Sequence, residues 1–248
     1  MTKELIYESL NHISSKTAVG IDGINVDEAK ASFEIWVNEM INSIHRKGYN
    51  PPAVKRVWIP KPGKVKKRPI GIPCVADRAL QRSVSTVLSA IYEQDFLDCS
   101  FGGRPGREAH NALATLNEDG KYEISETGTP QGGSISVLLS NIYLHYVLDL
   151  WFEKIVKPRL DGECYLIRYI DDFIICFQYK RDAERFRKVL EKRLAKFALK
   201  IEPNKTRLVE FGRFTHKHAK ERGKKMETIY FLGFTHFCTR NRKGNFMV

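Results

Sequence analysis

Cysteine is scarce in this sequence and is not arranged in pairs. The five cysteines are an odd number, lie far apart and include no C-x-x-C spacing. A disulfide framework or a zinc knuckle needs cysteines at short, repeated spacings. The sequence therefore excludes both kinds of site and favours a reducing compartment, so we expect the protein to be cytoplasmic.

Long uncharged apolar runs are also missing. The N-terminal segment MTKELIYESL lacks the apolar centre of a signal peptide, and no uncharged stretch is long enough to cross a bilayer. No internal repeat or flexible linker is visible either. We therefore expect neither secretion nor membrane insertion, and we expect the 248 residues to form one large domain or two small ones.

Acidic residues are outnumbered by basic ones. Asp and Glu total 29 against 41 Lys and Arg, which gives a formal charge of +12 at pH 7. An excess of this size favours a polyanionic partner such as nucleic acid, although membrane surfaces and ribosomes attract basic proteins as well. The charge narrows the class of partner without choosing among these three.

Apolar residues recur at helical spacing in four segments. The first runs from Phe33 to Ile44, with Asp27 expected as its cap, and the second begins at an Asp77 cap. The third follows GTPQGGSIS and ends near Pro158, and the fourth begins at Asp182 with Arg and Lys on its outer face. The residues expected to face inward in the last three helices are Leu80, Val84, Val87, Leu88 and Ile91; Leu139, Ile142, Tyr143, Tyr146, Val147 and Leu150; and Phe186, Val189, Leu190, Leu194 and Phe197.

Shorter apolar segments bounded by turn residues predict strands. AVKRVWIP and RPIGIP form a hairpin around the basic turn KPGKVKK, and YLIRY and FIICF form a second hairpin. Further strands are expected after the Asp-Gly pair within residues 117–125, in TRLVEF and in IYFLGFTHF. Helices interleaved with hairpin-connected strands indicate an α+β fold, with a mainly antiparallel sheet and helices packed on one face.

Two adjacent carboxylates, Asp171 and Asp172, interrupt the apolar run YLIRYIDDFIICF. Burying an unpartnered carboxylate is costly, and a divalent cation held at the tip of the hairpin removes this cost. Neighbouring strand residues point to opposite faces, so only one needs to be a full ligand, and we expect Asp171 to be the stronger one. The alternative is ordinary polar turn chemistry at a hairpin. The pair by itself leaves both interpretations open.

The surrounding motifs favour the cation. Y-I-D-D lies between two apolar strands, and GTPQGGSIS followed by SNIYLHYVLDLWFEK lies upstream. This ordered set resembles bacterial group II intron-encoded reverse transcriptases and maturases, and the similarity extends through GIDGINV, KKRPIGIP, FGGRPGREAH, EFGRF and FLGF, nearly the full chain. Y-x-D-D alone also occurs in other reverse transcriptase lineages, but the ordered set is much more specific.

The resemblance implies a reverse transcriptase that transfers nucleotides to a primer 3′-hydroxyl by two-metal chemistry with Mg²⁺. Asp171 and Asp172 would be the catalytic metal ligands of the palm, and Tyr169 would lie beside the primer terminus. Arg68 would grip the incoming deoxynucleoside triphosphate, helped by Lys67. A solvated basic turn is the alternative for these two basic residues.

The same resemblance implies contacts with the nucleotide sugar, the primer and the template. Gln131 of TPQGG would lie near the sugar, and Gly132 and Gly133 would let the backbone approach the primer and template closely. Arg104 and Arg107 of FGGRPGR would contact the template backbone. A loop with a helix cap is the alternative for the glycines, and solvated side chains are the alternative for the arginines. The implied partners are an RNA template, a DNA primer, deoxynucleoside triphosphates and group II intron RNA, with no membrane.

One motif of the family is missing. The family pattern places a strand of the kind D-x-x-x-F-F between FGGRPGR and GTPQGG, and this strand carries the other principal metal ligand. Here HNALATLNE continues directly into DGKYEISETGTPQGG, as if an internal segment had been removed. We expect too little negative charge for two cations, and we expect sheet edges and apolar faces to be left uncovered. The acids in this join, none of which matches the motif, are Glu108, Glu118, Asp119, Glu123 and Glu126.

Two functions therefore follow from the sequence. The first is an RNA-directed DNA polymerase with a fingers-like region over residues 1–116 and a partial palm over residues 117–248. The second is a catalytically inactive RNA-binding remnant of such an enzyme, because the first acidic palm motif is missing. The sequence ends soon after FLGF, at GNFMV, so we expect the thumb and the maturase region to be absent. Two smaller departures from the family pattern, Val137 for proline and Ile170 for alanine, are expected to be tolerated.

Overall fold

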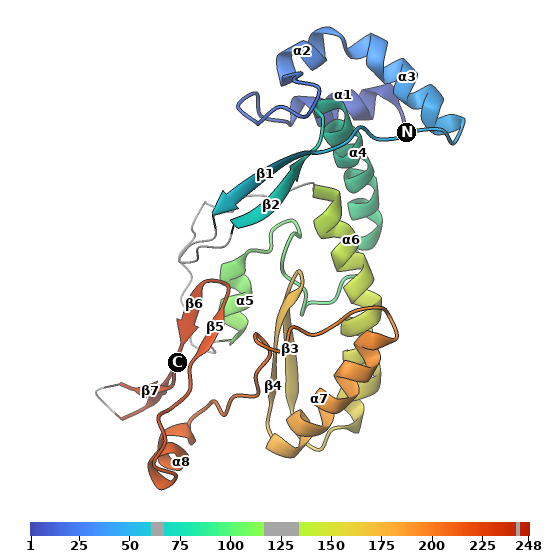
Figure 1. The fold of residues 1–248 in the computed structure, drawn as a ribbon. Helices are drawn as coiled ribbons and strands as arrows, with labels where there is room; N and C mark the ends of the chain where they lie inside the picture. The colour runs from blue at the N-terminus through green and yellow to red at the C-terminus, as the bar shows by residue number, and fades with distance from the viewer. Residues whose placement is uncertain (61–66, 117–133, 242–243) are drawn as a thin grey trace. The chain divides into compact units, whose positions relative to one another are not determined.

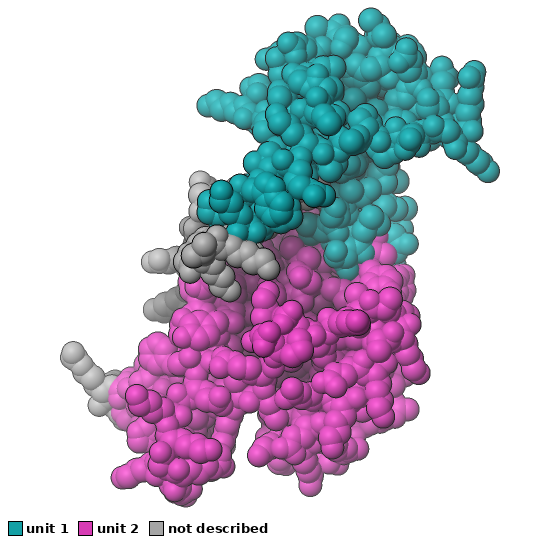
Figure 2. Space-filling model, viewed as in Figure 1, with its two compact units in different colours: residues 1–95, 127–140 teal, residues 96–126, 141–248 magenta. Residues whose placement is uncertain are grey.

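The chain divides into two compact units. The computed structural model describes residues 1–60, 67–116, 134–241 and 244–248. Unit 1 consists of Met1–Asp95 and Thr127–Ser140, and unit 2 consists of Phe96–Glu126 and Asn141–Val248 (Figure 2). Helices and short antiparallel strands occur in both units (Figure 1), so the chain has the mixed α+β character that the sequence predicts.

Four helices of unit 1 share one apolar core. They are α1 (Lys3–Asn11), α2 (Val26–Ala31), α3 (Phe33–His45) and α4 (Val75–Tyr92) (Figure 1). The helix expected from Phe33 is confirmed as α3, but Asp27 is not its cap. The Asn25 side chain accepts a hydrogen bond from the Glu28 amide, and the Glu28 carboxylate accepts one from the Asn25 amide, which starts the separate helix α2. The buried core residues are Ile6, Leu10, Val26, Ala29, Phe33, Val37, Val75 and Ala79.

Small residues bring α4 close to α1. The buried side chains of α4 include Ala79 and Ser83, and the Ser83 hydroxyl donates to the hydroxyl of Ser9 in α1 at 2.8 Å. The expected inward face is wrong at Val87 and Ile91, which are exposed, because the side chains that fit against α1 are the small ones. An apolar strip of α4 is therefore left uncovered among the described residues.

Asp77 does not cap α4. The helix begins at Val75, so Asp77 lies in its first turn with the side chain buried. The Tyr49 hydroxyl donates a hydrogen bond to the Asp77 carboxylate. This bond supplies the partner that a buried acid needs.

The basic hairpin of unit 1 has the expected strands. β1 (Lys55–Pro60) and β2 (Lys67–Ile72) are antiparallel, with Lys55 opposite Ile72 and Pro60 opposite Lys67. Residues 61–66 of the connecting turn lie outside the described residues. Every residue of β1 is exposed, so the hairpin contributes little to the core of unit 1 in the described part of the chain.

The long helix expected after GTPQGGSIS is confirmed. α6 (Ser134–Leu144) is followed by the π-helical segments η1 (His145–Asp149) and η2 (Phe152–Val156) and by a closing 3₁₀ turn, η3 (Lys157–Arg159) (Figure 1). The inward face is wrong in part, because Asn141 and Asp149 bond to the buried side chain of Arg168 and turn a polar stripe inward. The buried polar residues of this stripe are Asn141, His145 and Asp149, and the exposed residues that were expected inside are Leu139, Tyr143 and Tyr146.

The segment Ile135–Arg159 is long and apolar enough, by its 25 residues and its composition, to cross a membrane. Core helices of soluble proteins pass the same test. Here Asn141 and Asp149 of the segment are buried and hydrogen-bonded to other residues of unit 2.

The strands of unit 2 form hairpins rather than one sheet. IYFLGFTHF is not a single strand, because Leu232 and Gly233 adopt positive φ angles of 51° and 87° and form a tight turn between β5 and β6. TRLVEF belongs to no strand. With β1–β2, the described residues contain four separate two-stranded sheets. The expectation of uncovered strand edges stays a prediction. The pairs in unit 2 are β3 (Cys164–Tyr169) with β4 (Asp172–Phe177), β5 (Ile229–Phe231) with β6 (Phe234–His236), and β7 (Thr239–Arg240) with β8 (Phe246–Met247).

Helix α7 (Lys180–Ala195) packs its apolar side against the hairpin β3–β4. Phe186, Leu190 and Leu194 are buried as expected, whereas Val189 is exposed. The helix begins at Lys180, two residues before the expected start, because Asp182 is occupied elsewhere: its carboxylate accepts the amides of residues 161 and 162 at 3.0 and 3.1 Å. Two shorter helices, α5 (Ala109–Leu116) and α8 (Thr215–Glu221), also belong to unit 2.

Candidate active site

The hairpin β3–β4 presents the two adjacent carboxylates at its tip. The ladder ends with Tyr169 opposite Asp172, so Ile170 and Asp171 form a two-residue turn, as expected from YLIRYIDDFIICF. Side chains alternate between two cores along β3: Leu166 packs in the core with α7, and Ile167 packs in the core with α5. Because both faces of the hairpin are packed, its tip is held in a defined position within unit 2.

The carboxylates of Asp171 and Asp172 are exposed, and in the described part of the chain neither has a hydrogen-bond or ion-pair partner. Partial burial raises the pKa of Asp172 above its usual value, and the negative charge of Asp171 raises this pKa further, while Lys205 lowers it. Two acids that repel each other at a fixed tip are stabilised by a bound cation.

Asp171 and Asp172 alone do not supply the ligands of a two-metal site. A two-metal site needs further carboxylate oxygens that bridge or flank the cations. Within the described ranges, no group of three or more His, Cys, Asp or Glu side chains is placed to hold a metal ion. Glu108 is described and exposed. The other acids of the join, which lie outside the described residues, are Glu118, Asp119, Glu123 and Glu126.

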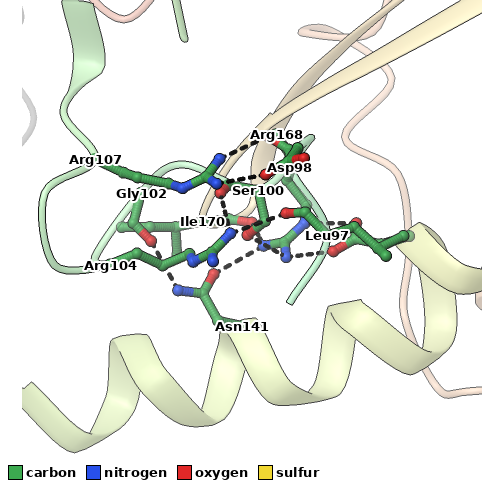
Figure 3. A network of polar contacts seen from close by, with 10 residues as sticks. Leu97, Asp98, Ser100, Gly102, Arg104, Arg107, Asn141, Arg168 and Ile170 are labelled. Carbon is green, nitrogen blue, oxygen red and sulfur yellow. Dashed lines mark hydrogen bonds and ion pairs between the residues drawn. The ribbon is translucent and has the colours of Figure 1, made fainter. Parts of the chain in front are cut away.

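A fully buried arginine holds the turn from inside unit 2. Arg168 lies two residues before Ile170, and its side chain is 0% exposed. Nε and Nη2 donate to the two carboxylate oxygens of Asp149 at 2.8 and 2.6 Å. Nη1 donates to Asn141 Oδ1 and to the Ile170 carbonyl, and Nη2 also donates to Ser100 Oγ, each at 2.8 Å (Figure 3). All five N–H groups of the guanidinium therefore have an acceptor.

The loop FGGRPGR packs directly against the same turn. A Cβ atom on Gly102 would lie 2.7 Å from Ile170 Cγ1 and 2.9 Å from Tyr169 Cδ1, so a side chain does not fit there. The Gly102 carbonyl accepts a hydrogen bond from Asn141 Nδ2 at 2.7 Å (Figure 3). Loop, helix and hairpin thus meet at the turn that carries the carboxylates.

Ile170 has a φ angle of 57°, in the left-handed region that β-branched residues rarely adopt. Two contacts hold Ile170 in this conformation. Its carbonyl accepts a hydrogen bond from Arg168, and its side chain packs against Gly102, which has no Cβ atom to obstruct it. A strained backbone persists only where its surroundings fix it, and such positions are concentrated at functional sites.

The other predicted site residues are divided between the units. Lys67 and Arg68 lie in β2 of unit 1, where Lys67 is exposed and Arg68 is half-buried. Tyr169 is the last residue of β3 in unit 2, and it packs with the apolar cluster around Ile167. The three residues of the TPQGG motif, Gln131, Gly132 and Gly133, lie outside the described residues. The contacts expected of all these residues stay predictions.

Both arginines of FGGRPGR have partners within unit 2. The buried Arg104 donates from Nη1 to the carbonyls of Leu97 and Ser100, at 2.9 and 2.8 Å. Arg107 donates to the Asp98 carboxylate at 2.5 Å (Figure 3). These bonds stabilise the loop, and the expected template contacts of Arg104 and Arg107, which stay predictions, would have to be made alongside them.

The sequence interpretation passes over the residues that hold the tip. An apolar strand over YLIRY leaves Arg168 out of account, and an inward face built from apolar and aromatic residues on the preceding helix leaves out Asn141 and Asp149. Two signals point to them. A charged residue within a buried strand needs a partner, and Asn141, His145 and Asp149 recur every four residues, which places them on one face of a helix.

Comparisons with known proteins agree with the motifs. A family model described as reverse transcriptase (RNA-dependent DNA polymerase) matches residues 115–236. Over 83% of its length the chain is 27% identical to the group II intron-encoded protein LtrA of Lactococcus lactis subsp. cremoris. It is 34% identical over 48% of its length to protein YkfC of Escherichia coli strain K12. The alignments cover 43% of LtrA and 31% of YkfC, so the chain spans less than half the length of either relative.

The alignment lengths also bear on the expected internal shortening. The LtrA alignment has 263 positions, whereas 83% of 248 residues is about 206, so about 57 positions have no counterpart in this chain. The chain is also 24% identical to an uncharacterized 91 kDa protein in a cob intron of Schizosaccharomyces pombe, of which the alignment covers 26%. This alignment has 213 positions but includes only 65% of the chain, about 161 residues, so about 52 positions again have no counterpart. The YkfC alignment, with 122 positions for about 119 residues, needs almost no such gap. The first two comparisons support a chain shortened internally relative to those proteins.

Proposed function

We propose that this chain, which is related to the reverse transcriptases of group II introns, acts as an RNA-directed DNA polymerase that extends a primer along an RNA template. The observation that carries this proposal is the pair of exposed, unpartnered carboxylates at the tip of a hairpin packed on both faces. The family generally uses divalent metal ions, and we propose that Asp171 and Asp172 hold Mg²⁺. When bound, such an ion neutralises charge on the nucleotide phosphates.

The proposal gives the other residues binding roles. We assign a fingers-like region to residues 1–116 and a partial palm to residues 117–248. Arg68 and Lys67 bind the triphosphate of the incoming nucleotide, because a guanidinium and an ammonium suit phosphate oxygens. Tyr169 lies beside the primer terminus, and the TPQGG residues approach the nucleotide sugar and the template. Group II intron RNA is the proposed RNA partner in the cytoplasm.

Two observations favour a second function. In the described residues the carboxylate pair has no third acid beside it, and two alignments leave more than 50 positions without counterpart in this chain. A chain that lacks the remaining metal ligand would still present basic surface to RNA, with its net charge of +12. We therefore keep an RNA-binding remnant without polymerase activity as the alternative function.

Primer extension separates the two functions. The full chain is incubated with poly(A), oligo(dT), thymidine triphosphate and Mg²⁺, alongside the Asp171→Ala variant. The matched control is Asp95→Ala, which removes another exposed aspartate from a turn, in unit 1. A polymerase extends the primer in the parent chain and in the Asp95→Ala control, and it loses extension in Asp171→Ala and in the absence of Mg²⁺.

RNA retention in the same samples completes the test. If the parent chain does not extend the primer but retains RNA with an affinity that falls steeply with salt, the remnant function is supported and the polymerase proposal fails. If extension persists in Asp171→Ala, the assignment of the metal ligands is wrong.

A further inference from the structure

We infer that Arg168 is a positioning residue: its buried guanidinium fixes the turn that aims Asp171 and Asp172, and it does so without touching a substrate. The catalytic consequence of this inference rests on the proposed function, because the aimed carboxylates matter only where they bind a cation. The structural part concerns the hairpin tip alone and can be tested separately.

The first argument is that the guanidinium cannot rotate without losing bonds. Its five donors are all used, by Asp149, Asn141, Ser100 and the Ile170 carbonyl, and its side chain is 0% exposed. Asp149 is 0% exposed as well. A bidentate ion pair that is closed to water fixes the orientation of the guanidinium plane.

The second argument is that this plane controls the turn. Nη1 binds the carbonyl of Ile170, and that carbonyl belongs to the peptide unit that also contains the amide of Asp171. The atoms of a peptide unit lie in one plane, so holding the carbonyl holds the direction in which the chain enters Asp171. The positive φ of Ile170 shows that the turn takes a conformation which isoleucine would not choose unaided.

The third argument concerns charge. Asp149 neutralises Arg168 inside unit 2, because the two side chains form a bidentate ion pair, at 2.8 and 2.6 Å, that is closed to solvent. The arginine therefore acts on the tip through geometry rather than by attracting the two carboxylates. A replacement that keeps the interior packed but removes the bond to Ile170 should leave the fold in place and release the tip.

The decisive variant is therefore the double substitution Arg168→Leu with Asp149→Leu. An apolar pair of similar volume often replaces a buried ion pair without loss of stability. Mn²⁺ serves as the probe cation, and its binding to the full chain is measured by electron paramagnetic resonance. Hydrogen exchange reports the amide of Asp172, the residue that pairs with Tyr169 at the end of the ladder, and a thermal melt reports the fold. Asp171→Ala provides the binding background.

We expect the double variant to melt near the temperature of the parent chain, to bind Mn²⁺ at least about tenfold more weakly, and to exchange the Asp172 amide at least about tenfold faster. Parent-like Mn²⁺ affinity together with parent-like exchange in the folded double variant would overturn the inference. If this variant does not fold, Arg168→Lys is judged by the same criterion, because lysine keeps the charge but cannot reach all four partners. If neither folds, Arg168 serves the core only and the inference is withdrawn.

The same measurements distinguish this inference from the proposed function. If the parent chain binds Mn²⁺ no better than Asp171→Ala, the carboxylates are not a cation site and the proposed function loses its support. Amide exchange at Asp172 still decides whether Arg168 positions the tip, because that measurement needs no cation.

Discussion

Arg168 and Asp149 form a bidentate ion pair in which neither side chain is exposed to solvent. The other partners of Arg168 lie in or beside three of the motifs that identify the sequence: Ser100 directly before FGGRPGR, Asn141 in SNIYLHYVLDLWFEK, and Ile170 in Y-I-D-D. Segments far apart in the sequence are therefore parts of one hydrogen-bond network, which gives a physical reason for their occurring together.

Removing one partner of this ion pair should be severe. Asp149→Asn leaves the charge of Arg168 buried and uncompensated, and we expect it to lower the free energy of unfolding by about 3–5 kcal/mol. The control is Glu153→Gln on the same helical segment, whose ion pair with Lys157 is partly exposed and should cost less than about 1 kcal/mol. Urea unfolding followed by tryptophan fluorescence measures both. Equal losses in the two variants would show that the buried pair has no special weight.

In the absence of a cation, the adjacent charges of Asp171 and Asp172 should lower the free energy of unfolding. The pKa of Asp172 is higher in the folded chain than in the unfolded chain, so the fold favours the protonated carboxyl. This stabilisation is complete below the ordinary aspartate pKa, and it is lost as the pH rises through the raised pKa of the folded chain. Asp172→Asn should therefore be more stable than the parent chain at pH 7, by about 0.5 kcal/mol, the scale of exposed charge pairs.

Thermal melts at two pH values check this sign. The advantage of Asp172→Asn should vanish at pH 3, where Asp172 is protonated in folded and unfolded chains alike. Millimolar Mg²⁺ should raise the melting temperature of the parent chain and leave that of Asp172→Asn unchanged. Asp95→Asn is the control and should show neither effect, because no pairing of that carboxylate is found within the described ranges. A less stable Asp172→Asn at pH 7 contradicts the prediction.

The sequence predicts elements well where one local pattern decides them. The hairpin at Y-I-D-D follows from two apolar runs around a polar pair, and α3 follows from helical spacing. The inward faces of α4 and α6 were wrong because packing at Ser83 and bonding at Asn141 depend on residues far away in the sequence. The prediction of one strand over IYFLGFTHF is wrong because Leu232 has a positive φ angle, which a leucine side chain gives no reason to expect.

The sequence predicts the two carboxylates at the tip of the hairpin, but it does not predict the residues that hold this tip in place. The carboxylates stand out because they interrupt an apolar run. Arg168 does not stand out in the same way, since its four partners lie 2 to 68 residues away along the chain. Only the fold brings Ser100 and Asn141 to one guanidinium, and spacing arguments along a single helix or strand do not reach across that distance.

The close approach of the glycine-rich loop to the turn gives a third prediction. Gly102→Ala places a Cβ within 3 Å of Ile170 and Tyr169, so either the loop or the turn must move. We expect a loss of about 1–3 kcal/mol in the free energy of unfolding, together with faster amide exchange at Asp172. Gly48→Ala is the control, since the nearest neighbour of its added methyl group lies at 4.0 Å. Unchanged exchange at the tip in a destabilised Gly102→Ala would mean that the loop yields and the turn does not.

The last prediction concerns acid stability at β6. His236 is buried, and its Nε2 atom has no hydrogen-bond partner among the described residues. Burial lowers the pKa of His236, because the charged ring is poorly solvated there. The neutral ring is therefore favoured in the fold, and its stabilising contribution is complete above pH about 6.5 and is lost as the pH falls towards the lowered folded value.

Substituting His236 should flatten this pH dependence. The parent chain is expected to lose on the order of 1 kcal/mol of stability between pH 7 and pH 5 through this residue, and His236→Gln should lose less over the same interval. His216→Gln, at an exposed histidine, serves as the matched control and should follow the parent chain. Urea midpoints measured at half-unit pH steps give the comparison. If His236→Gln and the parent chain fall in parallel, acid sensitivity arises from other groups and the buried ring is protonated without cost.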